Sequence, residues 1–294
     1  MSNYSPSPSI VRSGDIKLTG TRHGRSFTYD YRYVPSGKAK PVVIFVHGFK
    51  GFKDWGYFNM MADYMAAEGL VVVKLNLSHN GTTPDSPVDF DDLEAFGHNN
   101  FGLELDDLGQ VIDVITDPSE NLLNEEADKS GAGLIGHSRG GSLVLLKAAE
   151  DKRVKSVVTW AAVSDLEKRW DEHFINTWEQ EGVQYIPNAR TGQEMPMYFQ
   201  IVEDFRANRN RYSIPDLMPG LQVPLLVVHG LSDSSVPAEA ARQIKNWKPD
   251  AELMLVEGGD HVFGGGHPWQ EAKLPEPASS VIDKTVLFLK DHMR

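Results

Sequence analysis

Six stretches of the chain are almost continuously apolar over the length of a β-strand, which is typical of strands buried on both faces. They lie at 41–48, 69–77, 131–137, 154–163, 223–230 and 251–258. Apolar residues recur at helical spacing in five segments between or after them. These segments are 54–68, 101–116, 140–150, 237–247 and 277–293. The alternation predicts an α/β fold with a mostly parallel central sheet and helices on both faces.

Four segments depart from this alternation. Residues 15–34 alternate and turn like an antiparallel hairpin. Residues 165–219 are rich in charged and aromatic side chains, and we expect them to form a lid insertion near the carboxyl ends of the strands. A Ser/Pro-rich start predicts a flexible tail over 1–14, and the polar segment 78–99 predicts a loop. One α/β domain should therefore span 15–294.

Composition narrows the functional classes. A formal net charge of −12 argues against a basic face for nucleic acid or for an anionic membrane. The absence of cysteine excludes disulfides, a thiolate nucleophile and cysteine-ligated zinc. No apolar run reaches the roughly 18–20 residues of a membrane span. The first residues lack the apolar core of a secretory signal, so we expect a cytoplasmic protein, and no pattern predicts its oligomeric state.

The clearest chemical motif is Gly136-His137-Ser138-Arg139-Gly140, where a predicted strand gives way to a predicted helix. An abrupt strand-to-helix turn strains its apex residue, and small flanking residues let neighbouring backbone pass close by. The serine hydroxyl then stands exposed above the sheet. The alternative is a glycine-rich turn whose serine only caps the helix.

A serine needs a base to take its proton, and the base needs a carboxylate to orient it. His261 and Asp233 each follow a predicted strand, at the sheet edge where Ser138 also lies. Asp260 and Asp165 are alternative acids. Asp260 is disfavoured because adjacent residues rarely point the same way, and Asp165 because its motif is weaker.

Four segments resemble the α/β-hydrolase superfamily: HGF at 47–49, GHSRGG at 136–141, HGLSDSSVP at 229–237 and GGDHVF at 258–263. The resemblance spans roughly residues 15–290 and is closest to serine esterases of the dienelactone-hydrolase-like and feruloyl-esterase-like types. It implies that Ser138 is the nucleophile, Asp233 the acid and His261 the base. It also implies an oxyanion hole from the backbone amides of Phe49 and Arg139, with no cofactor and no metal.

Candidate substrate contacts gather in the insertion. Trp170, Phe174 and Trp178 are spaced four residues apart, so they share one face of a helix. That face either lines a pocket or packs on the core. Met195 and Tyr198 add apolar surface nearby, and His267 is a further pocket candidate beyond the insertion.

The sequence as a whole predicts a serine hydrolase of small to medium carboxylic esters, with short-chain or aryl acyl groups. Its only expected partner is the small-molecule ester. Acylaminoacyl or prolyl-type peptidase activity and perhydrolase activity would use the same three residues. A non-catalytic ligand-binding protein on a hydrolase fold is the alternative of a different class.

Overall fold

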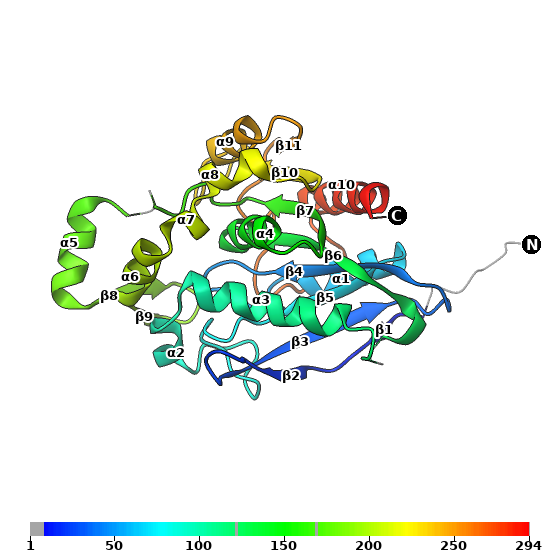
Figure 1. The fold of residues 1–294 in the computed structure, drawn as a ribbon, viewed down its shortest axis with the longest axis horizontal. Helices are drawn as coiled ribbons and strands as arrows, with labels where there is room; N and C mark the ends of the chain where they lie inside the picture. Colours follow the sequence, from blue (N-terminus) through cyan, green and yellow to red (C-terminus); the bar gives the residue numbers. More distant parts are fainter. Residues whose placement is uncertain (1–8, 121–122, 168–169, 294) are drawn as a thin grey trace, which may run out of the picture.

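The computed structural model describes residues 9–120, 123–167 and 170–293, built around a nine-stranded, mostly parallel sheet (Figure 1). In spatial order its strands are β1 (Val11–Arg12), β3 (Ser26–Tyr33), β5 (Val71–Leu75), β4 (Lys40–Val46), β6 (Ala127–His137), β7 (Val154–Trp160), β10 (Leu225–Gly230) and β11 (Glu252–Val256). β2 (Ile16–Thr19) pairs with β3. The pairings of β3 with β1, β2 and β5 are antiparallel, and all others in this sheet are parallel. The predicted fold class is confirmed.

Helices cover both faces of the sheet, which explains the continuous apolar strands. In β4, Val42 and Ile44 belong to the core beneath α3 (Phe101–Thr116), α4 (Arg139–Glu150) and α9 (Glu239–Trp247). Val43 and Phe45 belong to the opposite core, beneath α1 (Phe58–Ala67) and α10 (Glu276–His292). Successive side chains of one strand therefore enter two different cores. No helix within the described ranges is long and apolar enough to cross a bilayer.

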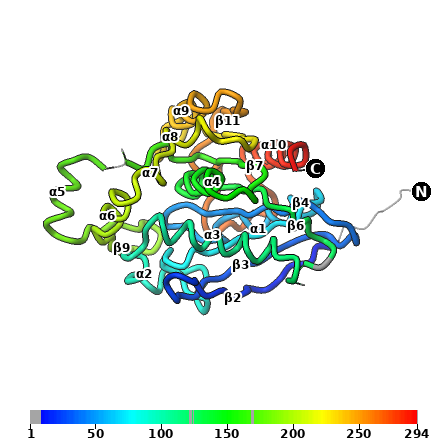
Figure 2. The backbone as a smooth tube through the Cα atoms, viewed as in Figure 1, coloured from blue at the N-terminus to red at the C-terminus, as the bar shows by residue number. Residues whose placement is uncertain are grey.

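The segment between β7 and β10 forms its own small substructure. It contains α5 (Glu172–Glu181), α6 (Gln200–Ala207), α7 (Arg209–Tyr212), α8 (Ile214–Leu217), the 3-10 turn η3 (Met218–Gly220) and a separate hairpin of β8 (Val183–Asn188) with β9 (Gln193–Tyr198). In the tube view, α5, α6 and β9 gather at the left end of the molecule, away from α10 (Figure 2). The predicted insertion thus adds no strand to the central sheet.

Two local predictions were wrong. The segment 78–99 contains a short helix, α2 (Leu93–Gly97), because the Asp92 carboxylate accepts the Ala95 amide 2.9 Å away and caps its first turn. Within the predicted tail, β1 pairs with β3, and Arg12 forms an ion pair with Asp63. Residues 1–8 of that tail lie outside the described residues.

A 3-10 turn, η1 (Asn124–Glu126), precedes β6.

A buried ion cluster holds the antiparallel hairpin against the parallel strands. The Lys53 ammonium lies 2.7, 2.6 and 2.5 Å from the carboxylates of Asp15, Asp30 and Asp54. Burial alone would lower the pKa of Lys53, but Asp30 and Asp54 outweigh it and raise that pKa. Lys74 lies 3.3 Å from Asp30 and also pairs with Asp54. Among the described residues, the carboxylates of Asp15, Asp30 and Asp54 form the one group close enough to share a metal ion. Their close contacts are with lysine ammonium groups.

We predict that Lys53→Met lowers the free energy of unfolding by about 3–5 kcal/mol, because it leaves buried carboxylates without their central cation. Lys284→Met is the matched control, since its ion pair with Glu252 is well exposed and should contribute about 1 kcal/mol or less. Urea unfolding of both variants measures the difference. Equal losses in the two variants would contradict the structural role of the cluster.

Candidate active site

The turn between β6 and α4 holds Ser138 in a strained backbone conformation, with φ 55° and ψ −120°. Glycine is needed on both sides of it. A Cβ at Gly140 would lie 2.3 Å from the Val46 carbonyl oxygen and 2.5 Å from that of His47. A Cβ at Gly136 would lie 2.2 Å from the Gly140 carbonyl oxygen. The Ser138 side chain makes no capping hydrogen bond to α4, so the structure does not support the capping alternative.

Three predicted side chains form a continuous hydrogen-bonded chain. His261, in the loop after β11, has Nε2 3.0 Å from Ser138 Oγ. Its Nδ1 lies 2.8 Å from Asp233 Oδ2, in the loop after β10. With Nδ1–H donating to the carboxylate, Nε2 is free of a proton and accepts from the serine hydroxyl. His261 lies 123 positions from Ser138 and 28 from Asp233 in the sequence, and the parallel sheet brings the three residues together.

The Asp233 carboxylate is fully enclosed yet well supplied with donors. Oδ1 accepts the backbone amides of Ser235 at 2.8 Å and Val236 at 2.9 Å, and His229 Nε2 lies 3.2 Å from Oδ2. Burial favours the neutral acid, but the hydrogen bonds from His229, His261 and Val236 outweigh it and hold the pKa of Asp233 well below its usual value. The carboxylate therefore stays ionised at neutral pH.

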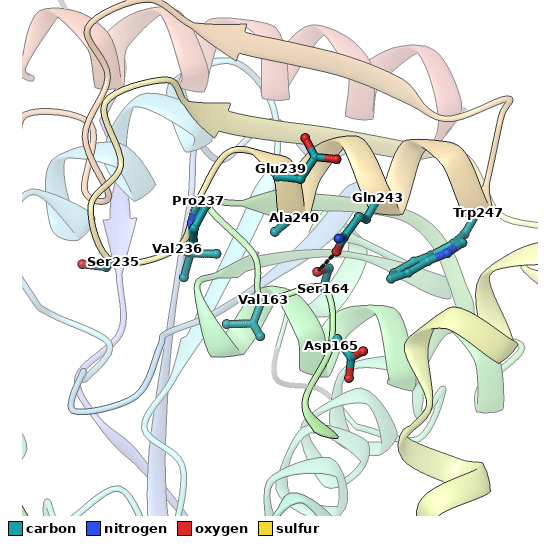
Figure 3. A pocket seen from close by; sticks show the side chains of 10 residues that line it. All are labelled: Val163, Ser164, Asp165, Ser235, Val236, Pro237, Glu239, Ala240, Gln243 and Trp247. Atoms are coloured by element: carbon teal, nitrogen blue, oxygen red, sulfur yellow. Dashed lines mark hydrogen bonds between the residues drawn. The ribbon is translucent and has the colours of Figure 1, made fainter. Parts of the chain in front are cut away.

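The two alternative acids have other partners. Asp260 Oδ1 accepts the backbone amides of Val262 at 3.1 Å and Gly264 at 2.8 Å, and so shapes the loop that carries His261. Asp165 accepts the Glu167 amide at 2.9 Å. Its side chain faces a cavity of about 700 Å³ that lies between the loop after β7 and α9 (Figure 3). Neither Ser138 nor His261 lines that cavity. Two of its lining residues are hydrogen-bonded to each other, because Ser164 Oγ donates to Gln243 Oε1 at 2.8 Å.

The histidines near Ser138 have structural partners. Burial lowers the pKa of His47 to about 4 and that of His137 to about 3, so both rings are neutral at physiological pH. His137 Nε2 donates to the backbone carbonyl of His261, 2.8 Å away, and so steadies the loop behind the imidazole. The Nε2–H of His229 is shared between the Val236 carbonyl, at 2.9 Å, and Asp233 Oδ2, at 3.2 Å.

Ser138 opens onto a cavity of about 200 Å³. Phe49 and His261 also line it, and Gly48 lets the loop after β4 approach closely, since a Cβ there would lie 2.9 Å from Ser138 Cβ. Several residues that line this cavity were not predicted from the sequence. They lie in the segment 50–58, in the β8–β9 hairpin and in the loop that carries His261, and they are Lys50, Trp55, Phe58, Asn188, Arg190 and Val262.

The prediction that Trp170, Phe174 and Trp178 share one helical face was wrong, because α5 begins at Glu172 and Trp170 precedes it. Trp170 lines a second cavity of about 120 Å³, together with Phe49 and Arg139. Trp178 is fully buried and donates its indole N–H to the Met197 carbonyl at 2.8 Å. Phe174 packs against Trp178, with ring centroids 5.7 Å apart. Trp178 and Phe174 therefore support the insertion from within and line neither cavity.

The other three pocket predictions also line neither cavity. Met195 is fully buried, and the Asn188 side-chain amide donates to its sulfur at 3.5 Å. Tyr198 donates its hydroxyl to Glu94 at 2.6 Å, which joins β9 to α2. His267 Nδ1 accepts the Gly56 amide at 2.9 Å and holds the loop that carries cavity-lining Trp55. Apolar composition alone does not distinguish a wall residue from the residue that supports it.

Comparison with known proteins identifies the family. Residues 43–272 match the model of the alpha/beta hydrolase family, so the chain belongs to this family. No curated protein matched the sequence.

Solved structures share the fold at low sequence identity. Est1E from Butyrivibrio proteoclasticus, solved with ferulic acid bound, superposes with a TM-score of 0.70 at 17% identity, over 95% of this chain and 99% of that chain. A dienelactone hydrolase from Anabaena variabilis gives 0.62 at 16% identity, over 96% and 99%. The esterase domain of a Rhodothermus marinus protein gives 0.63 at 18%, over 97% and 100%.

The lowered pKa of Asp233 predicts a pH-dependent stability difference. Asp233→Asn should lower the free energy of unfolding by about 2 kcal/mol at pH 7, because it removes the charge from an enclosed acceptor. The pKa of Asp233 in the folded state lies below its unfolded value of about 3.9. The stability that the ionised Asp233 supplies is therefore fully present at pH values above about 3.9. It is lost as the pH falls towards the folded-state pKa.

Denaturant unfolding of wild type and Asp233→Asn at pH 7, 5 and 3 measures this difference. The exposed Asp85, changed to asparagine, is the control and should have little effect at any of these pH values. A wild-type advantage over Asp233→Asn that stays constant from pH 7 to pH 3 would contradict the assignment of a lowered pKa.

Proposed function

We propose that this protein is a serine hydrolase of carboxylic esters. The observation that carries the proposal is the hydrogen-bonded chain from Ser138 through His261 to the enclosed carboxylate of Asp233. Each part meets a chemical need of acyl transfer. The serine is held apart from its helix, the imidazole faces it with an acceptor nitrogen, and an ionised carboxylate orients the ring.

In the proposed reaction, Ser138 Oγ attacks the ester carbonyl while His261 Nε2 takes the hydroxyl proton. The backbone amides of Phe49 and Arg139 hold the oxygen that becomes negative. Arg139 is the first residue of α4, where backbone N–H groups lack intrahelical partners and the helix dipole favours negative charge. The Gly51 amide donates to the Gly48 carbonyl at 3.1 Å, which shapes the turn that presents Phe49.

The tetrahedral intermediate then collapses, and His261 gives its proton to the departing alcohol. A water molecule enters, His261 takes a proton from it, and the resulting hydroxide attacks the acyl-enzyme. The second intermediate releases the carboxylic acid and restores Ser138. His261 carries one proton in each half of the cycle, and the ionised Asp233 stabilises the imidazolium that forms each time.

We propose short-chain or aryl acyl groups as substrates. Two observations support this size range: the cavities of about 200 and 120 Å³ around Phe49 are small, and their walls include Trp55, Phe58 and Trp170. The similar fold of Est1E, solved with ferulic acid, and that of a dienelactone hydrolase agree with small acids.

Ser138→Ala should retain the wild-type fold and lose ester turnover by about 10⁴-fold, because no other group replaces the nucleophile. Hydrolysis of p-nitrophenyl acetate measures the loss, and circular dichroism checks the fold. A fluorophosphonate should label wild type at Ser138 and leave the variant unlabelled. A folded Ser138→Ala variant that keeps most of its activity would overturn the mechanism. A wild-type protein with no turnover of any activated ester would favour the ligand-binding alternative.

Asp233→Asn should lose activity nearly as severely, because asparagine favours the wrong imidazole tautomer. Asp165→Asn and Asp260→Asn are the matched controls, and each should keep kcat/KM within about tenfold of wild type, since the carboxylate hydrogen-bonded to His261 Nδ1 is that of Asp233. Steady-state kinetics on p-nitrophenyl acetate compares the three variants. A crippling loss in Asp165→Asn alone would move the acid to that residue.

Among p-nitrophenyl esters, kcat/KM should be highest for acyl chains of about C2 to C6 or small aryl acids, by the size of the cavities. A series from acetate to palmitate at one pH measures the preference. Best turnover of C12 to C16 chains would contradict it. Aminoacyl amides hydrolysed faster than every ester would favour a peptidase with the same three residues.

A further inference from the structure

The second cavity, of about 120 Å³, adjoins the Ser138 cavity through a shared wall at Phe49. We call it the distal cavity. The residues that line it are apolar with one exception, Arg139. The remaining lining residues are Phe101, Leu166, Trp170, Ile186 and Met197. An engineered apolar cavity of about 150 Å³ binds benzene, so this volume suits a small ring or a short chain.

Arg139 is deeply buried, with only 6% of its side chain exposed. Nε donates to Glu104 at 3.0 Å, and the guanidinium carbon lies 4.5 Å from the centre of the Phe101 ring. Nη2 is enclosed and has no hydrogen-bond partner within the described part of the chain. A buried donor without a partner is unfavourable, so an acceptor that reaches this guanidinium would be bound selectively.

The charge of Arg139 is already balanced. Glu104 accepts Nε of Arg139 and also the side-chain amide of Asn99, at 2.7 Å. Burial keeps the pKa of Glu104 above its usual value even though these two donors oppose the rise. Both carboxylate oxygens face donors, which is the pattern of an ionised carboxylate paired with a guanidinium. A ligand anion would add an unbalanced charge to this enclosed pair, whereas a neutral acceptor would not.

The position of His261 decides which half of an ester enters the distal cavity. His261 must protonate the departing alcohol, and it lines the Ser138 cavity and not the distal one. The alcohol therefore leaves on the histidine side. An acid half that extended the other way would pass Phe49 and approach Arg139.

We propose that the distal cavity binds the acid half of the substrate, and that the Arg139 side chain recognises a neutral hydrogen-bond acceptor at the far end of that acid. This inference rests on the proposed esterase function and names its substrate class. The substrates are esters of small, uncharged acids that carry a ring nitrogen, ether or carbonyl acceptor remote from the reacting carbonyl.

Two esters of equal size test the inference. p-Nitrophenyl 3-(4-pyridyl)propanoate carries a neutral ring acceptor at pH 8, and p-nitrophenyl 3-phenylpropanoate replaces it with C–H. Wild type should prefer the pyridyl ester in kcat/KM by about 10- to 100-fold, as expected for a hydrogen bond to a charged donor. The anionic mono-p-nitrophenyl ester of adipic acid should be slower than the pyridyl ester. Equal rates for the two ring esters, or a preference for the anion, would overturn the inference.

Variants connect this preference to Arg139. Arg139→Met keeps the backbone amide but removes the donor, so the pyridyl-to-phenyl ratio should fall to about one or below. If the lone Glu104 prevents folding, the double variant Arg139→Met with Glu104→Gln removes both charges and should show the same ratio. Arg211→Met, on α7, is the control and should keep the wild-type ratio, since Arg211 pairs with Glu150 outside both cavities. A wild-type ratio in the double variant would overturn the role of Arg139.

Binding to an inactive variant separates this inference from the esterase proposal. Calorimetry on Ser138→Ala should show tighter binding of methyl 3-(4-pyridyl)propanoate than of methyl 3-phenylpropanoate. If that difference is present while wild type hydrolyses neither ester, the esterase proposal fails and the binding site stands. If wild type hydrolyses both esters but the variant binds them equally, the cavity assignment fails and the esterase stands.

Discussion

The close approach of two backbones at the β6–α4 turn is the constraint on which the site depends. The carbonyls of Val46 and His47, at the end of β4, lie where any side chain at position 140 would have to go. This contact brings the loop that carries Phe49 beside Ser138. It also accompanies the strained conformation that lifts the serine side chain away from its own helix. One packing contact therefore places both the proposed nucleophile, Ser138, and the proposed oxyanion hole.

The buried charges of the protein are paired locally, although the chain as a whole carries a large excess of negative charge. The chain carries a formal net charge of −12, yet its buried charges are matched locally. Lys53 is surrounded by carboxylates, Arg139 pairs with Glu104, and Asp233 is enclosed by donors. Because an unpaired charge in such places is costly, each pairing also fixes the orientation of the side chains involved. For Asp233 and Arg139, that orientation is what the proposed chemistry uses.

The insertion between β7 and β10 supplies residues that line the cavities, whereas the proposed catalytic residues lie outside it. Its buried Trp178 and Met195 support a hairpin whose Asn188 and Arg190 reach the Ser138 cavity. Lys50, next to the proposed oxyanion residue Phe49, donates to the Pro187 carbonyl at 3.0 Å and links the insertion to that loop. Changes in the hairpin would thus alter both the shape of the cavity and the loop that presents Phe49.

The sequence alone determined the fold class, the alternating strands and helices of the central sheet, and the placement of Ser138, Asp233 and His261 after buried strands. These follow from local signals: apolar periodicity, glycine spacing and polar residues after buried strands. The tertiary structure alone decided which side chains form the cavity walls. Trp178 lies on α5 and is buried in the insertion, whereas Trp170, which precedes that helix, lines a cavity. Asn188 and Arg190 lie in a hairpin with no periodic signal, and Glu104 is 35 residues from Arg139. Contacts over such separations depend on how the elements pack, which no local pattern encodes.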